Sequence, residues 1–371
     1  MEAPRILFLD DDHVLRIFRL VLSNREDDPW IGSWFAPEQV DLAPLVQAAH
    51  GLRPSEGAVV GLLPDHSAPV EDADIIVFRR GEITARTLDE HPSLQLVQRL
   101  GERTEGIDLA ALHRRGVQLS CLPRRTLRFT AEHALLLMLA RAKKLLPADA
   151  AVRRGMDAGA SAVAAPDGVA YNWAGIAGAT GLHGSTLGIV GLGEVGSLVA
   201  RLATAFGMTV LYFKPRRADA QREMALGVSY ATLDELLARS DYVSLHAPNV
   251  PENKGLAGRD FFGKMKRGAC FINTSRGQLV DEDALYNALA SGIIAGAGLD
   301  VHAIEPRPAG DRFVALPNVV LTPHLAGGAR SGVIEEFKVM AENFRAAKRG
   351  QDVAYRVIGT GPTLRENCQR T

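Results

Sequence analysis

The sequence GLGEVG at residues 191–196 restricts the possible fold of this chain more than any other segment. The apolar run at residues 186–190 predicts a β-strand directly before it, and the residues after it carry apolar side chains at helical spacing. Gly191 would allow a tight turn, Gly193 would let the backbone approach a ligand, and Gly196 would let the helix pack closely on the strand. This order predicts a doubly wound parallel α/β domain.

The same alternation of strands and helices is predicted along most of the chain. Short runs rich in Val and Ile alternate with amphipathic stretches, which is typical of βαβ units. The expected strands are residues 5–9, 75–78, 94–99, 117–121, 186–190, 209–213, 242–245, 269–273, 296–300 and 319–322. Residues 130–144 form the strongest helix candidate before the glycine motif. We expect a loop at residues 156–183 and a poorly ordered tail from Gly359.

The acidic segment after the first predicted strand has two interpretations. Its sequence, ILFLDDD, superficially resembles the start of a response-regulator receiver domain. A receiver would need an aspartate at the end of a later strand, whereas the run at residues 75–78 ends in Arg79 and Arg80. We therefore interpret the segment as a first strand followed by an acidic loop.

The composition and net charge of the chain limit the kinds of molecule that it is expected to bind. The formal net charge is -1 and the isoelectric point is about 6.8, so no global field attracts nucleic acid or an anionic membrane. The longest apolar run, at residues 134–140, is far shorter than the roughly 20 residues that cross a bilayer, and no secretory leader is evident. The three cysteines, Cys121, Cys270 and Cys368, form no CxxC pair. We expect a cytoplasmic protein with reduced thiols, no metal, no nucleic acid or membrane partner, and a small-molecule ligand.

The glycine motif indicates that the ligand includes a dinucleotide. A helix N-terminus offers free N–H groups and a partial positive charge to a pyrophosphate. About 20 residues further on, an NAD-preferring site would place an Asp or Glu at the next strand end. This chain has Lys214, Arg216 and Arg217 there, which could hold a 2′-phosphate, so we predict NADP(H) in preference to NAD(H). The alternative is that these cations are solvated loop charges.

Three later strand ends carry polar residues in the sequences NTSRG, GLDVHAIEP and LTPHLAG. Ligands bind beyond the carboxyl ends of the strands in doubly wound sheets, so these segments should converge. Reduction of a 2-oxo acid needs a proton donor for the carbonyl oxygen and a cation for the carboxylate. Arg276 can supply the cation, His324 can give or take the proton, and Glu305 can fix the imidazole. Taken singly, each residue also has an ordinary structural interpretation.

In this order after GLGEVG, the segments NTSRG, GLDVHAIEP and PNVVLTPHLAG resemble the signature segments of the D-isomer-specific 2-hydroxyacid dehydrogenase family. The resemblance covers residues 75–357 and is strongest over residues 187–327. It implies two doubly wound parallel-sheet domains with the crevice between them. The Rossmann-like cofactor domain would comprise residues 149–325, and the flavodoxin-like substrate domain would be discontinuous, at residues 1–148 and 326–371. Such enzymes are usually homodimers.

The resemblance also assigns roles to individual residues. It makes Arg276 the substrate-orienting cation, His324 the acid/base and Glu305 its partner. Beyond the glycines and cations already named, the implied cofactor contacts are Glu194, Val195, His246, Ala247, Pro248, Thr274, Ser275, Asp300, His324 and Gly327.

The N-terminal half departs from the family pattern. Arg103 stands where a second glycine of a glycine-rich loop is expected, and three arginines at residues 124–128 replace small or polar residues. An additional anionic group on the substrate would explain the arginines, whereas the alternative is a solvated or interface charge cluster. The candidate substrate contacts are Arg79, Arg80, Gly101, Arg103, Arg124 and Arg125.

These observations together predict an NADPH-preferring reductase of a small 2-oxo acid, reversible as a D-2-hydroxy acid dehydrogenase. One alternative is oxidation of formate or phosphite on the same scaffold, but formate-type sites of this family pair the histidine with glutamine, and this chain has Glu305. A second alternative is a non-catalytic corepressor that binds NAD(H) and a partner protein.

Overall fold

The structure is a computed structural model that describes residues 3–36, 38–53, 60–62, 72–155 and 171–357. The chain divides into two compact units. The first combines Met1–Thr126 with Ala329–Thr371, and the second is the contiguous segment Leu127–Gly328. Each unit contains a parallel sheet with helices on both faces, which confirms the predicted fold class.

The first unit is built on a five-stranded sheet in the order β2-β1-β3-β4-β5. All four pairings are parallel, and the order is that of flavodoxin-like folds. The strands are β1 (Ile6–Phe8), β2 (Val60–Leu62), β3 (Ile75–Phe78), β4 (Leu96–Leu100) and β5 (Gln118–Leu122). The helices are α1 (His13–Leu22), α2 (Pro29–Phe35), α3 (Ala43–Ala49), α4 (Ala85–Glu90), α5 (Leu109–Arg115) and α13 (Val333–Lys348), and the 3-10 turn η4 (Arg330–Gly332) precedes α13.

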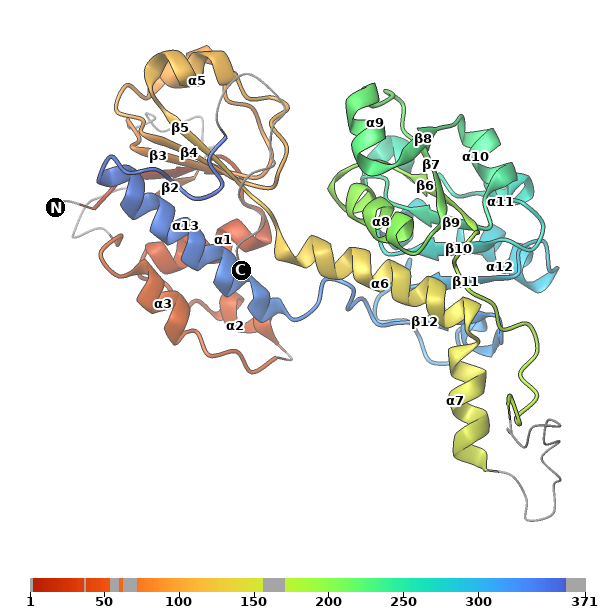
Figure 1. Cartoon of the computed structure of the whole chain (residues 1–371). Coiled ribbons are helices and arrows are strands. Elements are labelled where there is room, and N and C mark those ends of the chain that lie inside the picture. Colours follow the sequence, from red (N-terminus) through yellow and green to blue (C-terminus); the bar gives the residue numbers. More distant parts are fainter. Residues whose placement is uncertain (1–2, 37, 54–59, 63–71, 156–170, 358–371) are drawn as a thin grey trace. The chain divides into compact units, whose positions relative to one another are not determined.

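Successive side chains of each strand enter opposite cores of this unit. Ile6 and Phe8 lie in a cluster with α1, α2, α3 and α13, whereas Leu7 lies in a second cluster with α4 and α5. Figure 1 shows α13, in blue, beside α1 and α3, in red, on one face of the sheet. Phe337 and Phe344 of α13 are fully buried, and the Phe337 ring centroid lies 4.7 Å from that of Phe18. The C-terminal segment thus completes the core of the first unit.

The second unit contains a seven-stranded parallel sheet in the order β12-β11-β10-β9-β6-β7-β8. This is the Rossmann order with one added strand. The strands are β6 (Thr186–Val190), β7 (Thr209–Phe213), β8 (Val228–Tyr230), β9 (Tyr242–Leu245), β10 (Cys270–Asn273), β11 (Gly296–Leu299) and β12 (Val319–Leu321). The helices are α6 (Arg125–Ala142), α7 (Leu145–Arg154), α8 (Glu194–Ala205), α9 (Ala220–Leu226), α10 (Leu233–Arg239), α11 (Arg259–Lys264) and α12 (Glu282–Ala290), with 3-10 turns η1 (Pro251–Asn253), η2 (Gly277–Leu279) and η3 (Arg312–Ala315).

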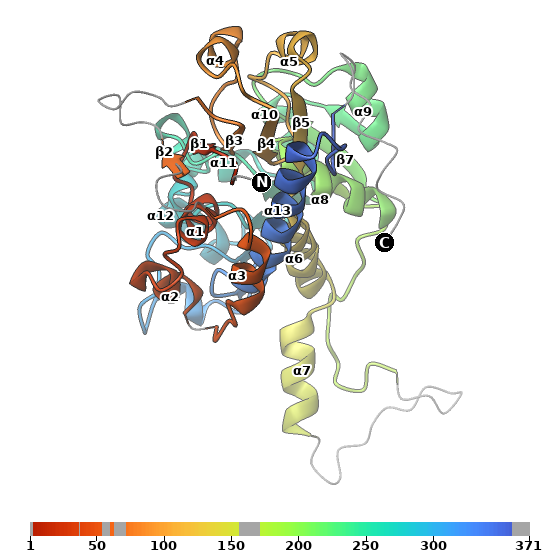
Figure 2. The same ribbon diagram turned by 90° about the vertical axis from the view of Figure 1, so that its left-hand side faces the viewer.

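The helices α6 and α8 cover one face of this sheet, and α10, α11 and α12 cover the other. Ile189 and Ile272 pack with the first pair, whereas Val243 and Phe271 pack with the second group. The remaining long helix, α7, has no buried residue. In both ribbon views α7 extends away from the helices and sheet of its own unit (Figures 1 and 2).

All ten predicted strands are present, with ends shifted by a residue or two. The predictions missed β2 and β8, which are three-residue strands at sheet edges and therefore carry little periodic signal. Helix α6 begins earlier than predicted, at Arg125, and α7 was not predicted. Part of the predicted loop at residues 156–183 and the tail from Gly359 lie outside the described residues.

The unit boundaries differ from the predicted ones. The first division falls after Thr126, whereas the prediction placed it after residue 148. The reason is α6, whose residues Ala134, Leu137 and Met138 lie in the core of the second unit. The chain returns to the first unit at Ala329, close to the predicted residue 326.

Among the described residues, no helix is both long and apolar enough to cross a membrane. Over the same part of the chain, no group of three or more His, Cys, Asp and Glu side chains is arranged to hold a metal ion. Cys121 and Cys270 are buried and form no disulfide among the described residues, and Cys368 lies outside them.

Candidate active site

The glycine motif forms the turn between β6 and α8. Gly191 has a φ of +105°, and a Cβ built on it would lie 2.5 Å from the carbonyl oxygen of His246. A Cβ on Gly196 would lie 2.1 Å from the carbonyl oxygen of Gly191, whereas a Cβ on Gly193 would meet nothing within 4 Å. The first and third glycines are therefore required by packing, and the second borders open space.

Two further features of this turn fit a bound dinucleotide. No side chain caps the N-terminus of α8 at Gly193, so the first N–H groups remain for a ligand, and Glu194 and Val195 begin the helix there. The hydroxyl of Thr274, on the loop after β10, is buried and has no hydrogen-bond partner among the described residues. The residues present therefore fit a pyrophosphate at the glycine turn and a polar group beside Thr274.

The three predicted phosphate cations after β7 differ in their surroundings. Arg217 donates two hydrogen bonds of 2.8 Å to Glu223, and the Tyr212 hydroxyl donates a third of 2.6 Å. The hydrogen bonds from Arg217 and Tyr212 lower the pKa of Glu223 to about 2. Lys214 is half-buried and Arg216 is exposed, and neither forms an ion pair with another described residue.

His246, Ala247 and Pro248 follow β9 and form one side of the glycine turn. The His246 carbonyl lies against Gly191, and its ring Nε2 lies 2.8 Å from the Ser244 hydroxyl. Burial lowers the pKa of His246 to about 4, so the ring is neutral near pH 7. Ala247 is half-buried and Pro248 is exposed.

The NTSRG loop after β10 is held by its own buried asparagine. Asn273 accepts a hydrogen bond of 2.9 Å from the Ser275 backbone N–H and donates one of 3.1 Å to the Arg276 carbonyl. Ser275 donates from its hydroxyl to the Leu245 carbonyl at 2.6 Å. The Arg276 side chain is exposed. This loop presents a guanidinium to solvent on a fixed backbone.

Gly277 brings that loop against the HAIEP segment after β11. A Cβ at Gly277 would lie 2.1 Å from the carbonyl carbon and oxygen of His302. Any larger residue would therefore separate the two backbones. Arg276 thus lies one residue from this contact, and His302 lies three residues before Glu305.

Glu305 and His324 form a direct pair. The Nδ1–H group of His324 donates to Glu305 Oε2 at 2.7 Å, which leaves Nε2 for another proton acceptor or donor. The two side chains are 35% and 45% exposed, respectively, so a ligand can reach them. Burial opposes ionisation of Glu305, but hydrogen bonds from His324 and from the His302 backbone lower its pKa below the usual value.

The loop that carries His324 is organised by Asp300. His324 has a φ of +55°, and its backbone N–H donates to the Asp300 carbonyl at 2.8 Å. The Asp300 carboxylate is fully buried and accepts from the backbone N–H groups of Leu325 and Ala326 at 3.0 and 2.9 Å. Its oxygens thus hold the loop that carries His324, which ends at the half-buried Gly327.

The sequence matches the D-isomer specific 2-hydroxyacid dehydrogenase NAD binding domain over residues 135–326. The chain belongs to this dehydrogenase family. A glyoxylate reductase of Korarchaeum cryptofilum is 39% identical over 284 residues, which are 76% of this chain and 82% of the reductase. A D-3-phosphoglycerate dehydrogenase of Mycobacterium tuberculosis is 34% identical over 337 residues. That match covers 87% of this chain but only 60% of the mycobacterial protein.

Solved structures agree with the family assignment. An apo form of the D-mandelate dehydrogenase of Rhodotorula graminis matches with a TM-score of 0.55 and 26% identity, over 97% of this chain and 99% of that chain. Family membership places the chain among nicotinamide-dependent oxidoreductases of 2-hydroxy and 2-oxo acids.

Sequence reasoning did not assign three residues that shape the site of this family member. Asn273 was quoted only as part of a motif, although it fixes the Arg276 loop. His133 lies on the buried face of α6 and contacts Thr322. His302 lies between Asp300 and Glu305 and contacts both the Glu305 carboxylate and the Thr322 carbonyl, two residues before His324. The available signal was a polar residue at a position where the local pattern is apolar.

The predicted substrate residues of this family member lie in the first unit. Arg79 forms an ion pair with Asp12, and the backbone N–H groups of Arg79 and Arg80 donate to Asp10 at 2.7 and 3.0 Å. The acidic loop after β1 therefore fixes the turn after β3. Gly101 has a φ of +137° and donates its N–H to the Leu122 carbonyl at 2.8 Å. The side chain of Arg103 in the same loop is exposed.

Arg124 and Arg125 precede or begin α6 and lie beside a buried carboxylate. Glu336 of α13 is 2% exposed, and its Oε1 accepts a hydrogen bond of 2.8 Å from the Arg125 backbone N–H. Burial raises the pKa of Glu336, although the charges of Arg124, Arg125 and Arg79 oppose this rise. The arginines thus have a structural neighbour that the sequence did not reveal.

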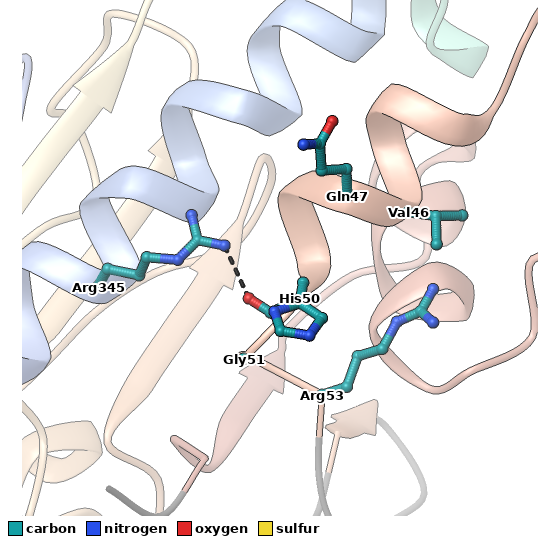
Figure 3. Close-up of a pocket in the computed structure, with 6 residues that line it drawn as sticks. All are labelled: Val46, Gln47, His50, Gly51, Arg53 and Arg345. Carbon is teal, nitrogen blue, oxygen red and sulfur yellow. Dashed lines mark hydrogen bonds between the residues drawn. The ribbon is translucent and has the colours of Figure 1, made fainter.

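A separate surface hollow of about 780 Å³ lies in the first unit between α3 and α13 (Figure 3). Its lining residues are Val46, Gln47, His50, Gly51, Arg53 and Arg345. Arg345 donates to the carbonyl oxygens of Ala48 and His50, and Arg53 pairs with Glu26. Both guanidinium groups are thus engaged by the protein itself.

Proposed function

We propose that this protein transfers a hydride between NADP(H) and a small 2-oxo acid or D-2-hydroxy acid. The observation that carries the proposal is the Glu305–His324 hydrogen bond at the end of a Rossmann-ordered sheet. A carboxylate bound to Nδ1 favours the protonated imidazole and leaves Nε2 as the proton donor. The pair therefore suits reversible proton transfer to a carbonyl oxygen.

Each residue of the set has a separate task. His324 Nε2 gives a proton to the carbonyl oxygen during reduction and takes it back during oxidation. The exposed guanidinium of Arg276 binds the substrate carboxylate and stabilises charge on the carbonyl oxygen. Glu305 keeps the imidazole in one tautomer. A bound nicotinamide would supply or accept the hydride.

The preference for NADP(H) rests on two cations. Lys214 and Arg216 follow β7 and have no ion pair among the described residues, so both are available to a 2′-phosphate. Glu223 of α9, an acid that contacts this turn, is already paired with Arg217. We therefore propose that Lys214 and Arg216, more than Arg217, recognise the phosphate.

The most specific part of the proposal is that the substrate carries an additional anionic group. In the first unit, the arginines Arg79, Arg80, Arg124 and Arg125 lie near the carboxylates of Asp10, Asp12 and Glu336. Burial raises the pKa of Glu336, so this carboxylate offsets the charges of Arg124 and Arg125 less than a readily ionised one would. The mycobacterial relative is named as a dehydrogenase of D-3-phosphoglycerate, which is itself multiply anionic.

The deciding experiment is a panel of 2-oxo acids assayed with NADPH and with NADH by the absorbance of the reduced nicotinamide. We expect turnover of glyoxylate or a related 2-oxo acid, faster with NADPH, and faster for dianionic than for monoanionic substrates. Equal rates for both substrate classes would leave the arginines a structural role. Oxidation of formate or phosphite without any 2-oxo acid reduction would support the first alternative, and binding of NADH without turnover would support the corepressor.

We further propose that the protein is a homodimer that buries α7. Leu145, Leu146 and Val152 of this helix are exposed, as are Tyr171 and Trp173 on the segment that follows residue 170. Apolar side chains on a projecting helix are typical of an interface between copies. Light scattering should give twice the mass of the chain, and Leu145→Asp with Leu146→Asp should halve it. The predicted cytoplasmic location stays a prediction.

A further inference from the structure

His302 contacts both segments that carry the Glu305–His324 pair. It follows β11 and is 6% exposed. Its backbone N–H donates to Glu305 Oε1 at 2.9 Å, and its ring Nε2 lies 2.9 Å from the Thr322 carbonyl oxygen, two residues before His324. One residue is thus bonded to the carboxylate of the pair and to the segment that presents the imidazole.

Arg307 fixes the tautomer of His302. The Nε and Nη2 atoms of Arg307 lie 3.1 and 2.9 Å from His302 Nδ1. A guanidinium has donors only, so Nδ1 must be the acceptor. The ring proton therefore resides on Nε2, from which it is donated to the Thr322 carbonyl.

Arg307 is itself anchored on several sides. Its side chain is 11% exposed and pairs with Glu282 at 2.7 Å and with Asp311 at 2.6 Å. The guanidinium carbon lies 4.9 Å from the centroid of the Phe313 ring. Glu282 also accepts from the Ala303 backbone N–H at 3.1 Å, so α12 holds both Arg307 and the residue after His302.

Thr322 is held from its other side as well. Its hydroxyl donates to Asp300 Oδ1 at 2.6 Å, and the hydroxyl oxygen accepts from His133 Nε2 at 3.0 Å. Burial lowers the pKa of His133, although the charge of Asp300 opposes this, and the neutral ring can serve as the donor. Thr322 therefore contacts His302 through its carbonyl and His133 through its side chain.

We propose that His302, held by Arg307, is a positioning residue that sets the distance between Glu305 and His324. Its hydrogen bonds join the two segments directly, and the residue is buried. A carboxylate and an imidazole transfer protons efficiently only when their separation is fixed, so a small displacement has a large cost in rate. The proposal rests on the proposed function, which gives this pair its catalytic role.

The first test replaces His302 by residues that keep one property each. His302→Phe keeps the size of the ring but loses the donor to Thr322, whereas His302→Gln keeps an N–H donor. We expect His302→Phe to lower kcat/KM by on the order of 10²-fold and His302→Gln by less than about 10-fold. The acidic limb of the pH profile for hydroxy-acid oxidation should move to lower pH in His302→Phe, because a displaced Glu305 no longer favours the imidazolium.

The second test compares two neighbouring arginines that share two kinds of contact, although the Arg307 side chain is 11% exposed and that of Arg312 is 43% exposed. Arg307 and Arg312 each pair with an acid of α12, Glu282 and Asp283 respectively, and each lies over the Phe313 ring. Of the two, Arg307 contacts His302. We expect Arg307→Met to lower kcat/KM by about 10-fold with the same shift of the acidic limb, and Arg312→Met to stay within about twofold of the native value.

Thermal unfolding and NADPH binding, followed by fluorescence, are measured for every variant, with His324→Gln as the benchmark. Native rates and an unmoved limb in His302→Phe and Arg307→Met, beside an inactive His324→Gln, overturn the positioning role and leave the proposed function standing. Equal losses in Arg307→Met and Arg312→Met overturn it too, because general packing then explains both. A fully active His324→Gln overturns the proposed function itself. If His302→Phe does not fold, a near-native His302→Gln beside an impaired Arg307→Met supports the proposal, and two native-like variants overturn it.

Discussion

Two glutamates of this protein lie beside positive charge, one in each unit, and they differ in what surrounds them. The Glu305 side chain is 35% exposed and accepts hydrogen bonds from His324 and from the His302 backbone. Glu336 is 2% exposed, and its Oε2 has no hydrogen-bond partner among the described residues. The pKa of Glu305 is lowered by these hydrogen bonds against the effect of burial, whereas burial raises the pKa of Glu336.

The difference shows that burial, set against the hydrogen bonds that each carboxylate accepts, decides how readily it ionises. A carboxylate that ionises readily and can be reached from solvent suits proton transfer, whereas a buried one suits holding a loop.

The cations after β7 also differ in whether they are paired. Arg217 is paired with Glu223, whereas Lys214 and Arg216 have no ion pair among the described residues.

The largest effect is expected from replacing Arg276, the exposed cation that binds the substrate in the proposed function. Arg276→Ala should lower kcat/KM by on the order of 10³-fold, because the guanidinium binds the carboxylate and stabilises charge on the carbonyl oxygen. Steady-state kinetics with the best 2-oxo acid measure this, with Arg259→Ala, at the exposed start of α11, as the control. Near-native turnover of Arg276→Ala would mean that Arg276 does not bind the substrate and that the reaction takes place elsewhere.

Removing the charge of Glu305 should be the next largest change. Glu305→Gln should lower kcat/KM by on the order of 10²-fold. In the native chain the Glu305 carboxylate accepts the Nδ1–H of His324, and the amide of glutamine brings no negative charge to that position. The acidic limb of the oxidation profile, where His324 must be deprotonated, should therefore move to lower pH. An unmoved limb in the pH dependence of kcat/KM would mean that Glu305 is not the functional partner.

The cations after β7 test whether Lys214 and Arg216 contribute more to cofactor preference than Arg217, which is paired with Glu223. Lys214→Ala combined with Arg216→Ala should reduce the ratio of kcat/KM for NADPH to that for NADH by about 10-fold or more. Arg217→Ala should change this ratio less, because Glu223 already holds that guanidinium. Equal kcat/KM values for NADPH and NADH in the native chain would mean that Lys214 and Arg216 do not recognise a 2′-phosphate.

The smallest effect is expected at the sealed glutamate. Folding disfavours ionised Glu336, so the native chain loses stability as the pH rises through the raised pKa. Glu336→Gln should therefore be more stable than the native chain near neutral pH, by about 1 kcal/mol, with no gain below about pH 4.5. The glutamine still accepts the Arg125 N–H bond.

Urea unfolding in a Trp173→Phe background measures this difference, since the other tryptophans, Trp30 and Trp34, both lie in the first unit. Glu335→Gln, an exposed neighbour paired with Lys338, is the control and should change stability by less than about 0.5 kcal/mol. A pH-independent difference between Glu336→Gln and the native chain would contradict the raised pKa.

Sequence patterns predicted the interior of both sheets because each central strand, such as β6 or β10, is a continuous run of four or five largely apolar residues. They also singled out Arg276, Glu305 and His324 as candidates, since each follows a predicted strand, and the structure pairs Glu305 with His324. They could not locate the contacts of His302 with Arg307 and Thr322, because these depend on how three loops meet in space. Glu336 occupies an apolar position of α13, where a single acid gives no hint of its partner.

The discontinuous first unit has a consequence for synthesis of the chain on the ribosome. Helix α13 supplies Phe337, Met340 and Phe344 to the core that β1 and α1 begin. That core stays incomplete until the chain has been made past residue 348, whereas the second unit is contiguous from residue 127 to residue 328. Domains usually complete their folding in order from the N-terminus. Here the unit whose first residues leave the ribosome earliest completes its folding last, so its apolar strands must avoid aggregation during synthesis of the second unit.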